Sequence, residues 1–234
     1  MKQNNQKKRR ASAPVAHKGN SGFYRFAHGI LAKFFLWLYR VRVRHAERQP
    51  KDQTYLLCCN HISAMDPILL AAALSKQQTH FMAKKELFRI PVLAQVLRAL
   101  NSYPVDRAGD VGAIKTSIAL IEAGNSVGMF PQGTRCPDKE PRETVDMLKN
   151  GAGLLCDKTH VCVLPVCLRT KGNKLRIFRG AELIVGEPIP YEQLAVSEDL
   201  GELTHRAKHA AYARISCAIF ERICALYEEE TDAE

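Results

Sequence analysis

The hydrophobic and polar positions divide the chain into a polar start, an apolar stretch at helical spacing, and a long region of short apolar runs. In the apolar stretch, hydrophobic residues follow the spacing of one helix face from Phe23 to Val41, which predicts an amphipathic helix. Arg25, Lys33 and Arg40 interrupt it, whereas a helix that spans a membrane needs roughly 20 apolar residues with few charges. The pattern favours a helix in a membrane interface, and it also fits a helix that packs on the body of the same protein.

Beyond residue 53, short apolar runs alternate with helical patterns, and this order is typical of an α/β domain. We expect strands within 54–60, 79–88, 126–135, 160–169 and 174–189, a strand or turn at 102–107, and helices within 63–75, 92–101, 111–124, 143–159 and 200–229. Ser63 or Asp66 is the expected N-cap of the helix that starts near residue 63. The whole chain then divides into a basic disordered arm at 1–20, the amphipathic segment at 21–46, a domain at 47–228 and an acidic tail at 229–234.

The positive charge is concentrated at the start of the chain. Of the 34 Lys and Arg residues, eleven lie within residues 1–46, which contain none of the 24 Asp and Glu residues. The net charge of +10 therefore belongs to this region, and it indicates an anionic partner. Nucleic acid is not the expected partner, because the neighbouring aromatic residues are arranged as a helix face rather than spaced for base stacking.

The eight cysteines give no sign of a metal site or of disulfides. Most lie in apolar contexts and none forms a C-x-x-C pair, so we expect buried free thiols in a reducing cytosol. His160, Cys162 and Cys167 have a spacing that matches no common metal site. His205 and His209 lie four residues apart, but the sequence between them lacks the glutamate of a zinc protease. No metal is therefore expected.

The stretch "NHISAMDP" at 60–67 places a histidine at the end of an apolar run and an aspartate five positions later. A tight turn would bring His61 and Asp66 together, so that the carboxylate fixes the tautomer of the ring. The other ring nitrogen would then accept a proton from a hydroxyl nucleophile. Ser63 would complete a triad within the protein, but no G-x-S-x-G sequence supports it. The alternative interpretation is a capping aspartate beside an ordinary histidine whose hydrogen bonds are satisfied.

Groups suited to a phosphate follow other predicted strands. In "FPQGTR" at 130–135, a glycine turn offers backbone N–H groups together with Thr134 and Arg135. Arg107 ends "YPVDR", and Lys84 and Lys85 follow the strand that starts near residue 79. Ligands of α/β domains usually bind at strand ends, so a base and several cations are expected along one edge of the domain.

Four ordered blocks resemble those of the glycerolipid acyltransferases, in particular the bacterial 1-acyl-sn-glycerol-3-phosphate acyltransferases. "NHISAMDP" resembles the N-H-x-x-x-x-D signature, and "YPVDR" resembles the second motif, which ends in Arg. "FPQGTR" resembles the F-P-E-G-T-R block, and "VLPVCL" resembles the proline-centred fourth motif. The similarity covers most of residues 47–200. It implies an α/β fold with one acyltransferase domain, a central mixed sheet flanked by helices, and a basic amphipathic helical segment before it that docks on a membrane.

The resemblance also implies a reaction. A fatty acyl group would pass from acyl-CoA or acyl-ACP (acyl carrier protein) to the free hydroxyl of lysophosphatidate, giving phosphatidate without a covalent acyl-enzyme, a cofactor or a metal. His61, oriented by Asp66, would act as the base, and Pro165 would shape the strand beside an acyl channel. The residues implied for the phosphate are Arg107, Gly133, Thr134 and Arg135, with Lys84 as a further candidate.

One position departs from the family pattern, because Gln132 stands where the third motif carries Glu. Gln keeps the shape of Glu but loses its charge, which raises the positive potential beside Arg107 and Arg135. We therefore expect Gln132 to take part in positioning the acceptor. Two alternatives stay open: an acyltransferase for glycerol 3-phosphate or another lysophospholipid, and a membrane-bound lipid-binding protein with impaired catalysis.

The expected partners are an anionic bilayer surface, lysophosphatidate and an acyl-CoA or acyl-ACP donor. The basic arm and the amphipathic segment resemble the membrane-docking element of the family. We therefore expect a peripheral or monotopic protein at the cytoplasmic face of the cell membrane.

Overall fold

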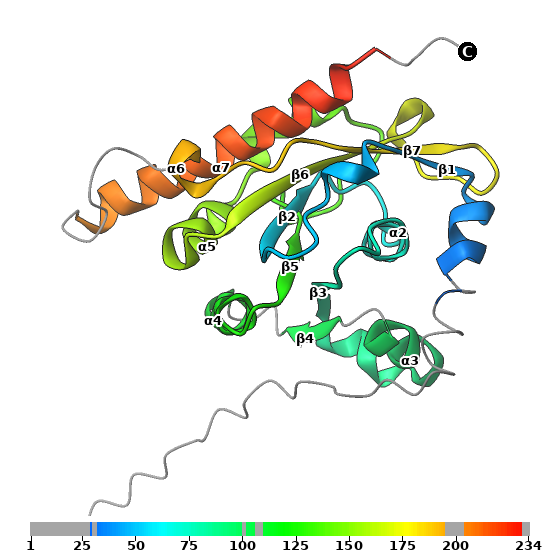
Figure 1. Cartoon of the computed structure of the whole chain (residues 1–234), viewed down its shortest axis with the longest axis horizontal. Helices are drawn as coiled ribbons and strands as arrows, with labels where there is room; N and C mark the ends of the chain where they lie inside the picture. The colour runs from blue at the N-terminus through cyan, green and yellow to red at the C-terminus, as the bar shows by residue number, and fades with distance from the viewer. Residues whose placement is uncertain (1–28, 30–31, 100–101, 106–109, 195–203, 231–234) are drawn as a thin grey trace, which may run out of the picture.

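The computed structural model describes residues 29, 32–99, 102–105, 110–194 and 204–230. The basic arm expected at 1–20, the first part of the amphipathic segment and the last four residues of the acidic tail lie outside the described residues. In the described part of the chain, seven strands form one sheet with the order β1-β7-β6-β2-β5-β3-β4 (Figure 1). The strands are β1 (Val41–Arg44), β2 (Tyr55–Cys59), β3 (Thr79–Lys84), β4 (Tyr103–Val105), β5 (Ser126–Met129), β6 (Cys162–Arg169) and β7 (Ala181–Val185).

The sheet is mixed. β6 and β7 pair antiparallel, whereas every other pair of neighbouring strands is parallel. The amino ends of β1 and β7 therefore lie at the same edge of the sheet as the carboxyl ends of β2, β5 and β6. The residues just before β1 and β7 are brought to the edge that carries the motif residues after β2 and β5.

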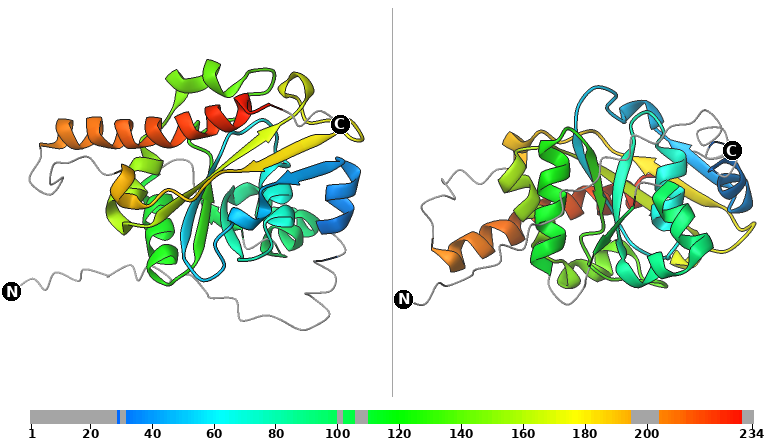
Figure 2. Two further views of the ribbon diagram at one scale, coloured as in Figure 1. Left: turned by 45° about the horizontal axis from the view of Figure 1, so that its top comes forward. Right: turned by 90° about the horizontal axis from the view of Figure 1, so that it is seen from below.

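Helices cover both faces of the sheet (Figure 2). The α-helices are α2 (Asp66–Ala73), α3 (Pro91–Ala99), α4 (Asp110–Glu122), α5 (Gly151–Thr159), α6 (Tyr191–Leu194) and α7 (His205–Glu228), and the 3-10 helices are η1 (Ala46–Arg48), η2 (Lys85–Arg89), η3 (Pro141–Met147) and η4 (Lys171–Asn173). α4, α5 and α7 pack with Leu56 and Cys58 of β2, and α2 packs with Tyr55, Leu57 and Cys59 on the opposite face. Because alternate residues of a strand point to opposite faces, a strand covered on both sides is apolar throughout.

The helix predicted from Phe23 through Val41 ends earlier than expected. Residues 32–38 are helical, but Val41–Arg44 form β1 and pair with β7. Arg40 takes a φ of 46°, a left-handed conformation that a continuing helix does not allow. Val41 and Val43 then pack on the face that carries α2, so the two-residue alternation of β-branched side chains prevails over the helical spacing.

None of the helices within the described residues combines the length and the apolar character needed to cross a membrane.

Two further expectations change in detail. The helix expected over 143–159 is divided between η3 and α5, and of the stretch at 174–189 only Ala181–Val185 is a strand. All eight cysteines are free and seven are buried, with Cys217 partly buried, which confirms the expectation of buried free thiols for those seven. Burial raises the pKa of the Cys58 and Cys59 thiols well above the usual range.

Candidate active site

The carboxyl end of β2 is fixed to β6 by the side chain of Asn60. Its amide donates to the carbonyl oxygen of Leu168 at 2.9 Å and accepts from the N–H of Leu168 at 2.8 Å. Asn60 is buried, and these two bonds follow directly after the last register pair, Cys59 with Val166. The next residue, His61, therefore leaves the sheet from a fixed position.

The turn after β2 brings His61 and Asp66 into contact. His61 Nδ1 lies 2.7 Å from Asp66 Oδ2. The same oxygen accepts from the N–H groups of Ile62 at 2.7 Å and Ser63 at 2.8 Å. Asp66 is fully buried at the start of α2, where Pro67 fits the first turn. An ionised carboxylate only accepts hydrogen bonds, so the proton of the neutral ring resides on Nδ1 and Nε2 is left as a base.

The ring of His61 is held by stacking and is open at one nitrogen. It stacks on Phe130, with centroids 4.0 Å apart and an interplanar angle of 16°. The side chain is 16% exposed, and no residue in the described part of the chain hydrogen-bonds to Nε2. The Ser63 hydroxyl instead accepts from the N–H of Met65 at 3.2 Å. Met65, not Ser63 or Asp66, is the N-cap residue of α2, so that expectation is wrong.

The segment after β5 holds the backbone of His61 on both sides. Gln132 Oε1 accepts from the His61 N–H at 2.7 Å, and the Cys136 N–H donates to the His61 carbonyl oxygen at 2.7 Å. Gly133 has a φ of 67°, a conformation that glycine adopts at little cost. Its N–H donates to the carbonyl oxygen of Phe130 at 2.9 Å and closes the turn. The third motif therefore positions His61 through backbone contacts.

Gln132 is 1% exposed, and both ends of its amide are bonded within the protein. Its Nε2 donates to Thr144 Oγ1 at 2.8 Å, and the Thr144 hydroxyl donates to the carbonyl oxygen of Pro141 at 2.7 Å. The amide thus holds the His61 backbone, and a part of Gln132 in positioning the acceptor stays a prediction. Because the one hydroxyl proton of Thr144 already goes to Pro141, the site fits an amide better than an ionised carboxylate.

The phosphate candidates are distributed around this turn. Thr134 and Arg135 are exposed, next to the residue whose N–H binds the His61 carbonyl. Lys84 is the last residue of β3, which neighbours β5. Arg107 lies outside the described residues. The structure therefore brings Gly133, Thr134 and Arg135 to His61 and places the backbone of Lys84 two strands away from β2.

Pro165 is buried within β6, opposite Cys58 of β2. Its carbonyl oxygen accepts from the N–H of Gly186 at 2.9 Å. A Cβ at Gly186 would lie 2.9 Å from Pro165 Cγ, so the ring packs closely on the chain just after β7 ends. These contacts are structural, and a place beside an acyl channel stays a prediction.

Three residues whose side chains support His61 received no role from the sequence alone: Asn60, Phe130 and Thr144. Asn60 and Phe130 are the first residues of their motifs, which is the signal that was available. Thr144 lies 12 residues from Gln132, and no spacing rule connects them. Only the path of the chain from β5 to η3 reveals that contact.

Two thiols lie near His61, but neither is suited to act as a nucleophile. Burial raises the pKa of both Cys59 and Cys136, so neither is a ready thiolate at neutral pH. Cys136 Sγ is directed towards the carbonyl oxygen of Thr134, at 3.7 Å. Within the described residues, no three His, Cys, Asp or Glu side chains gather as metal ligands would. An open ring nitrogen such as Nε2 of His61 can accept a proton from a hydroxyl.

Comparison with known proteins shows the family to which this chain is similar. The sequence model of the family described as Acyltransferase matches residues 40–169. The 1-acyl-sn-glycerol-3-phosphate acyltransferase of Bacillus subtilis is 31% identical over 170 residues, which cover 70% of this chain and 82% of that protein. The protein of the same name from Streptococcus pneumoniae is 29% identical over 193 residues, covering 79% and 69%.

The fold has a counterpart among solved structures. The crystal structure of the 1-acyl-sn-glycerophosphate acyltransferase of Thermotoga maritima matches 90% of each chain with a TM-score of 0.60 and 22% identity. The family match covers more than half of this chain and includes His61, Asp66 and the turn that holds them. The chain therefore belongs to the acyltransferase family.

Proposed function

We propose that this protein transfers a fatty acyl group from an acyl thioester to the free sn-2 hydroxyl of 1-acyl-glycerol 3-phosphate, giving phosphatidate. The observation that carries the proposal is the 2.7 Å contact between His61 Nδ1 and Asp66, which leaves Nε2 open beside the exposed turn at 133–135. Similarity to proteins named 1-acyl-sn-glycerol-3-phosphate acyltransferase supports the acceptor.

In the proposed reaction, His61 Nε2 takes the proton of the acceptor hydroxyl while its oxygen attacks the carbonyl carbon of the thioester. The new C–O ester bond forms and the C–S bond breaks. The imidazolium then gives its proton to the departing thiolate of CoA or ACP. The buried carboxylate of Asp66 keeps the ring in the required tautomer and stabilises the imidazolium. The substrate hydroxyl takes the place that a serine would have in a protein triad.

The phosphate of the acceptor is proposed to bind at the turn after β5. Thr134 and Arg135 are exposed there, and a guanidinium with a hydroxyl and backbone N–H groups suits a phosphate. Lys84 and Arg107 stay further candidates from the sequence. Because Gln132 is buried and bonded within the protein, its missing charge supplies no argument for a different acceptor.

We also propose a peripheral or monotopic location at the cytoplasmic face of the cell membrane, since the acceptor is a membrane lipid and the positive charge is concentrated in residues 1–46. A deletion that tests the arm should remove residues 1–28 only. It then leaves the helix at 32–38 and the strand β1, which pairs with β7, in place. Flotation with vesicles should show weaker binding for this deletion than for the full chain. Equal flotation would contradict a role of the arm.

An acceptor panel tests the reaction. The purified chain is given lysophosphatidate, glycerol 3-phosphate or lysophosphatidylcholine in the same detergent, with acyl-CoA or acyl-ACP, and free thiol is measured. Lysophosphatidate should give the highest kcat/KM, by about tenfold or more, because only it carries both a free phosphate monoester and an acyl chain. A preference for glycerol 3-phosphate would contradict the proposed acceptor, and no thiol release with any pair would contradict an acyltransferase.

A further inference from the structure

Most of the large apolar side chains that are exposed in the described part of the chain gather at one place, where the chain enters β1 and β7. Five large hydrophobic side chains are exposed within the described residues, and four of them are here. Phe34 is 48% exposed and Trp37 63%, and both lie in the helix at 32–38. Ile177 is 52% exposed and Phe178 46%, and both lie in the β6–β7 loop, which is the segment 170–180. The fifth, Ile90, lies elsewhere, just before α3.

Direct contacts join the helix at 32–38 to the β6–β7 loop. The rings of Trp37 and Phe178 meet edge to face at 5.3 Å, and Phe34 lies 6.2 Å from Trp37. The N–H of Phe178 donates to the carbonyl oxygen of Leu38 at 2.9 Å. Phe178 takes a φ of 58°, an unfavourable conformation for an aromatic residue. A strained residue whose ring stays exposed adds little to the core, which indicates a role outside it.

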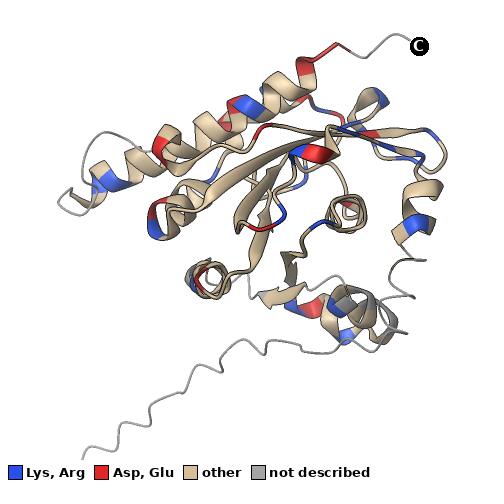
Figure 3. Cartoon of the chain, in the orientation of Figure 1, with Lys and Arg blue, Asp and Glu red and all other residues tan. Residues whose placement is uncertain are grey.

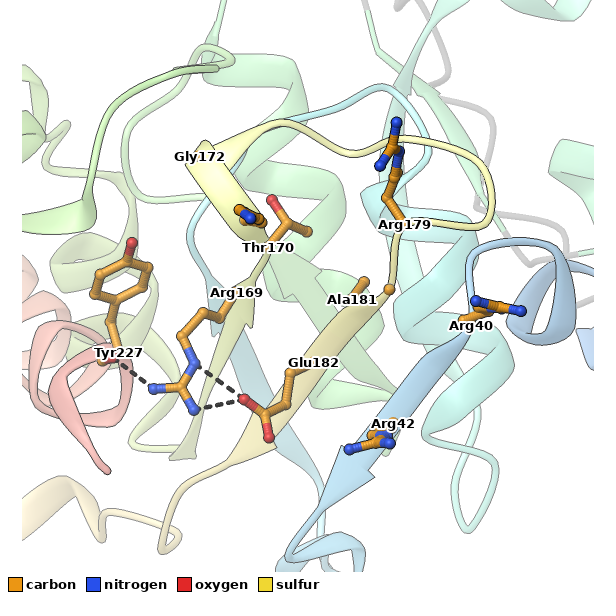
Figure 4. Close-up of a pocket in the computed structure, with 11 residues that line it drawn as sticks. Arg40, Arg42, Arg169, Thr170, Gly172, Arg179, Ala181, Glu182 and Tyr227 are labelled. Carbon is orange, nitrogen blue, oxygen red and sulfur yellow. Dashed lines mark hydrogen bonds and ion pairs between the residues drawn. The ribbon is translucent and has the colours of Figure 1, made fainter. Parts of the chain in front are cut away.

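Close by in the sequence, residues that include Arg179, which directly follows Phe178, line a basic cavity (Figure 4). Arg40, Arg42, Lys171 and Arg179 line it, and Figure 3 shows Lys and Arg on β1 and on the loop between β6 and β7. Glu182 is the one acidic residue among the described residues of the lining, and two guanidinium nitrogens of Arg169 bind it.

Three of the cations that line this cavity, Arg40, Lys171 and Arg179, are available to an anion. Arg169 also donates to the carbonyl oxygens of Tyr227 and Glu229, so it is committed to the fold. Within the described residues, Arg40, Lys171 and Arg179 form no ion pair. The cavity therefore presents unneutralised positive charge.

The cavity is separate from the site around His61. Val41 and Leu183 face the side of the sheet that carries α2 and Asp66. Their neighbours Arg42 and Glu182 therefore point to the opposite side, because strand residues alternate. Both sites nevertheless lie at the edge of the sheet where β2 and β6 end. A flat surface that contacts this edge of the sheet would therefore contact the cavity. It would also lie close to the end of β2, which His61 and Asp66 follow.

We propose that the β6–β7 loop and the helix at 32–38 form one surface that docks on an anionic bilayer. Ile177, Phe178 and Trp37 enter the boundary between headgroups and acyl chains, and Arg40, Lys171 and Arg179 bind the headgroups of anionic lipids. A second copy of this chain fits less well, because a two-fold contact would place like charges opposite each other. An acidic carrier protein would match the cations but not the exposed apolar rings. The inference rests on the proposed function in one respect, which is that the bilayer supplies the acceptor.

Vesicle binding by the full chain tests the loop. The vesicles contain phosphatidylcholine alone or mixed with phosphatidylglycerol. The double variant Ile177→Ser with Phe178→Gly removes two apolar side chains, and glycine accepts the positive φ of residue 178, so the backbone is not further strained. Binding to mixed vesicles should weaken by about tenfold or more. The matched control Ile90→Ser removes an equally exposed side chain elsewhere and should bind like the wild type.

A second pair of variants tests the cavity. Lys171→Gln with Arg179→Gln should weaken binding to mixed vesicles by about tenfold or more and leave binding to phosphatidylcholine unchanged. The control Arg206→Gln with Arg214→Gln removes two exposed charges from α7 and should have little effect. Wild-type vesicle binding by both test variants would overturn the inference. So would variants that lose affinity for an acidic carrier protein but keep their affinity for vesicles.

The outcome is separable from that of the proposed reaction, because vesicle binding needs no turnover. A wild-type chain that binds mixed vesicles without acyl transfer would refute the reaction alone. Conversely, both test variants should retain wild-type thiol release on a monomeric short-chain lysophosphatidate. Loss of that activity would show a folding or active-site defect in place of a docking defect, and would overturn the inference.

Discussion

Replacing Asp66 by Asn removes a charge while keeping the shape of the side chain. One carboxylate oxygen accepts three hydrogen bonds, from His61 Nδ1 and from the N–H groups of Ile62 and Ser63. These three donors will keep the single oxygen of Asn facing them, so its NH2 group takes the position of Oδ1. That position is buried and has no hydrogen-bond partner within the described residues. An unpaired buried donor costs about 1–3 kcal/mol, so the free energy of unfolding should fall by that amount.

The effect of Asp66→Asn on the rate follows from the lost charge. Two unit charges about 4 Å apart attract each other by about 4 kcal/mol at an effective dielectric constant near ~20. Since about 1.4 kcal/mol corresponds to a tenfold change in rate, kcat should fall by up to about a thousandfold. The KM for lysophosphatidate should change little, because Asp66 is buried behind His61.

The assay measures thiol release together with urea unfolding of the same preparation. Asp157→Asn is the matched control, because Asp157 is a largely buried carboxylate in α5 that binds Lys158 at 3.0 Å. The control should lose stability and keep its kcat. A folded Asp66→Asn variant with kcat within tenfold of the wild type would refute the stabilisation of an imidazolium by this carboxylate.

Three other variants test the surroundings of His61. Asn60→Ala removes both bonds to Leu168 and should lower the free energy of unfolding by about 2–3 kcal/mol, measured with urea; an unchanged midpoint would contradict the link between β2 and β6. Gln132→Glu should lower stability by about 1–3 kcal/mol without changing the preferred acceptor, because Thr144 has no second proton to donate; a switch of acceptor on the panel would show that residue 132 contacts it. Arg135→Ala should raise the KM for lysophosphatidate by about tenfold and leave that for acyl-CoA unchanged, whereas the exposed control Lys139→Ala should change neither; equal effects on both substrates would remove Arg135 from the phosphate site.

The contact at the centre of the site was predictable because it is local. His61 and Asp66 are five residues apart, and a turn between a buried strand and a helix brings them together. The strands β2, β5 and β6 were also predictable, because both faces of the sheet are covered and their sequences are apolar runs.

Expectations were wrong where a distant partner decides the structure. The sequence around Val41 follows a helical spacing, but β7, about 140 residues later, offers a parallel strand with which β1 pairs. Ile177 and Phe178 belong to an apolar run that predicts a strand, yet both are exposed in a loop. The surroundings of Gln132 could not be predicted, because the sequence shows only the loss of a charge. Its burial and its bond to Thr144 depend on the fold of η3 against the turn.

The central claim is that His61 Nε2 takes the proton of the lipid hydroxyl. Its most direct test compares kcat for thiol release by the wild type, His61→Ala and His205→Ala, with acyl-CoA and lysophosphatidate in the same detergent. His205 is exposed at the start of α7, so its replacement should leave kcat unchanged. His61→Ala should lower kcat by about 10²–10⁴-fold. A folded His61→Ala variant that releases thiol at the wild-type rate would contradict the claim.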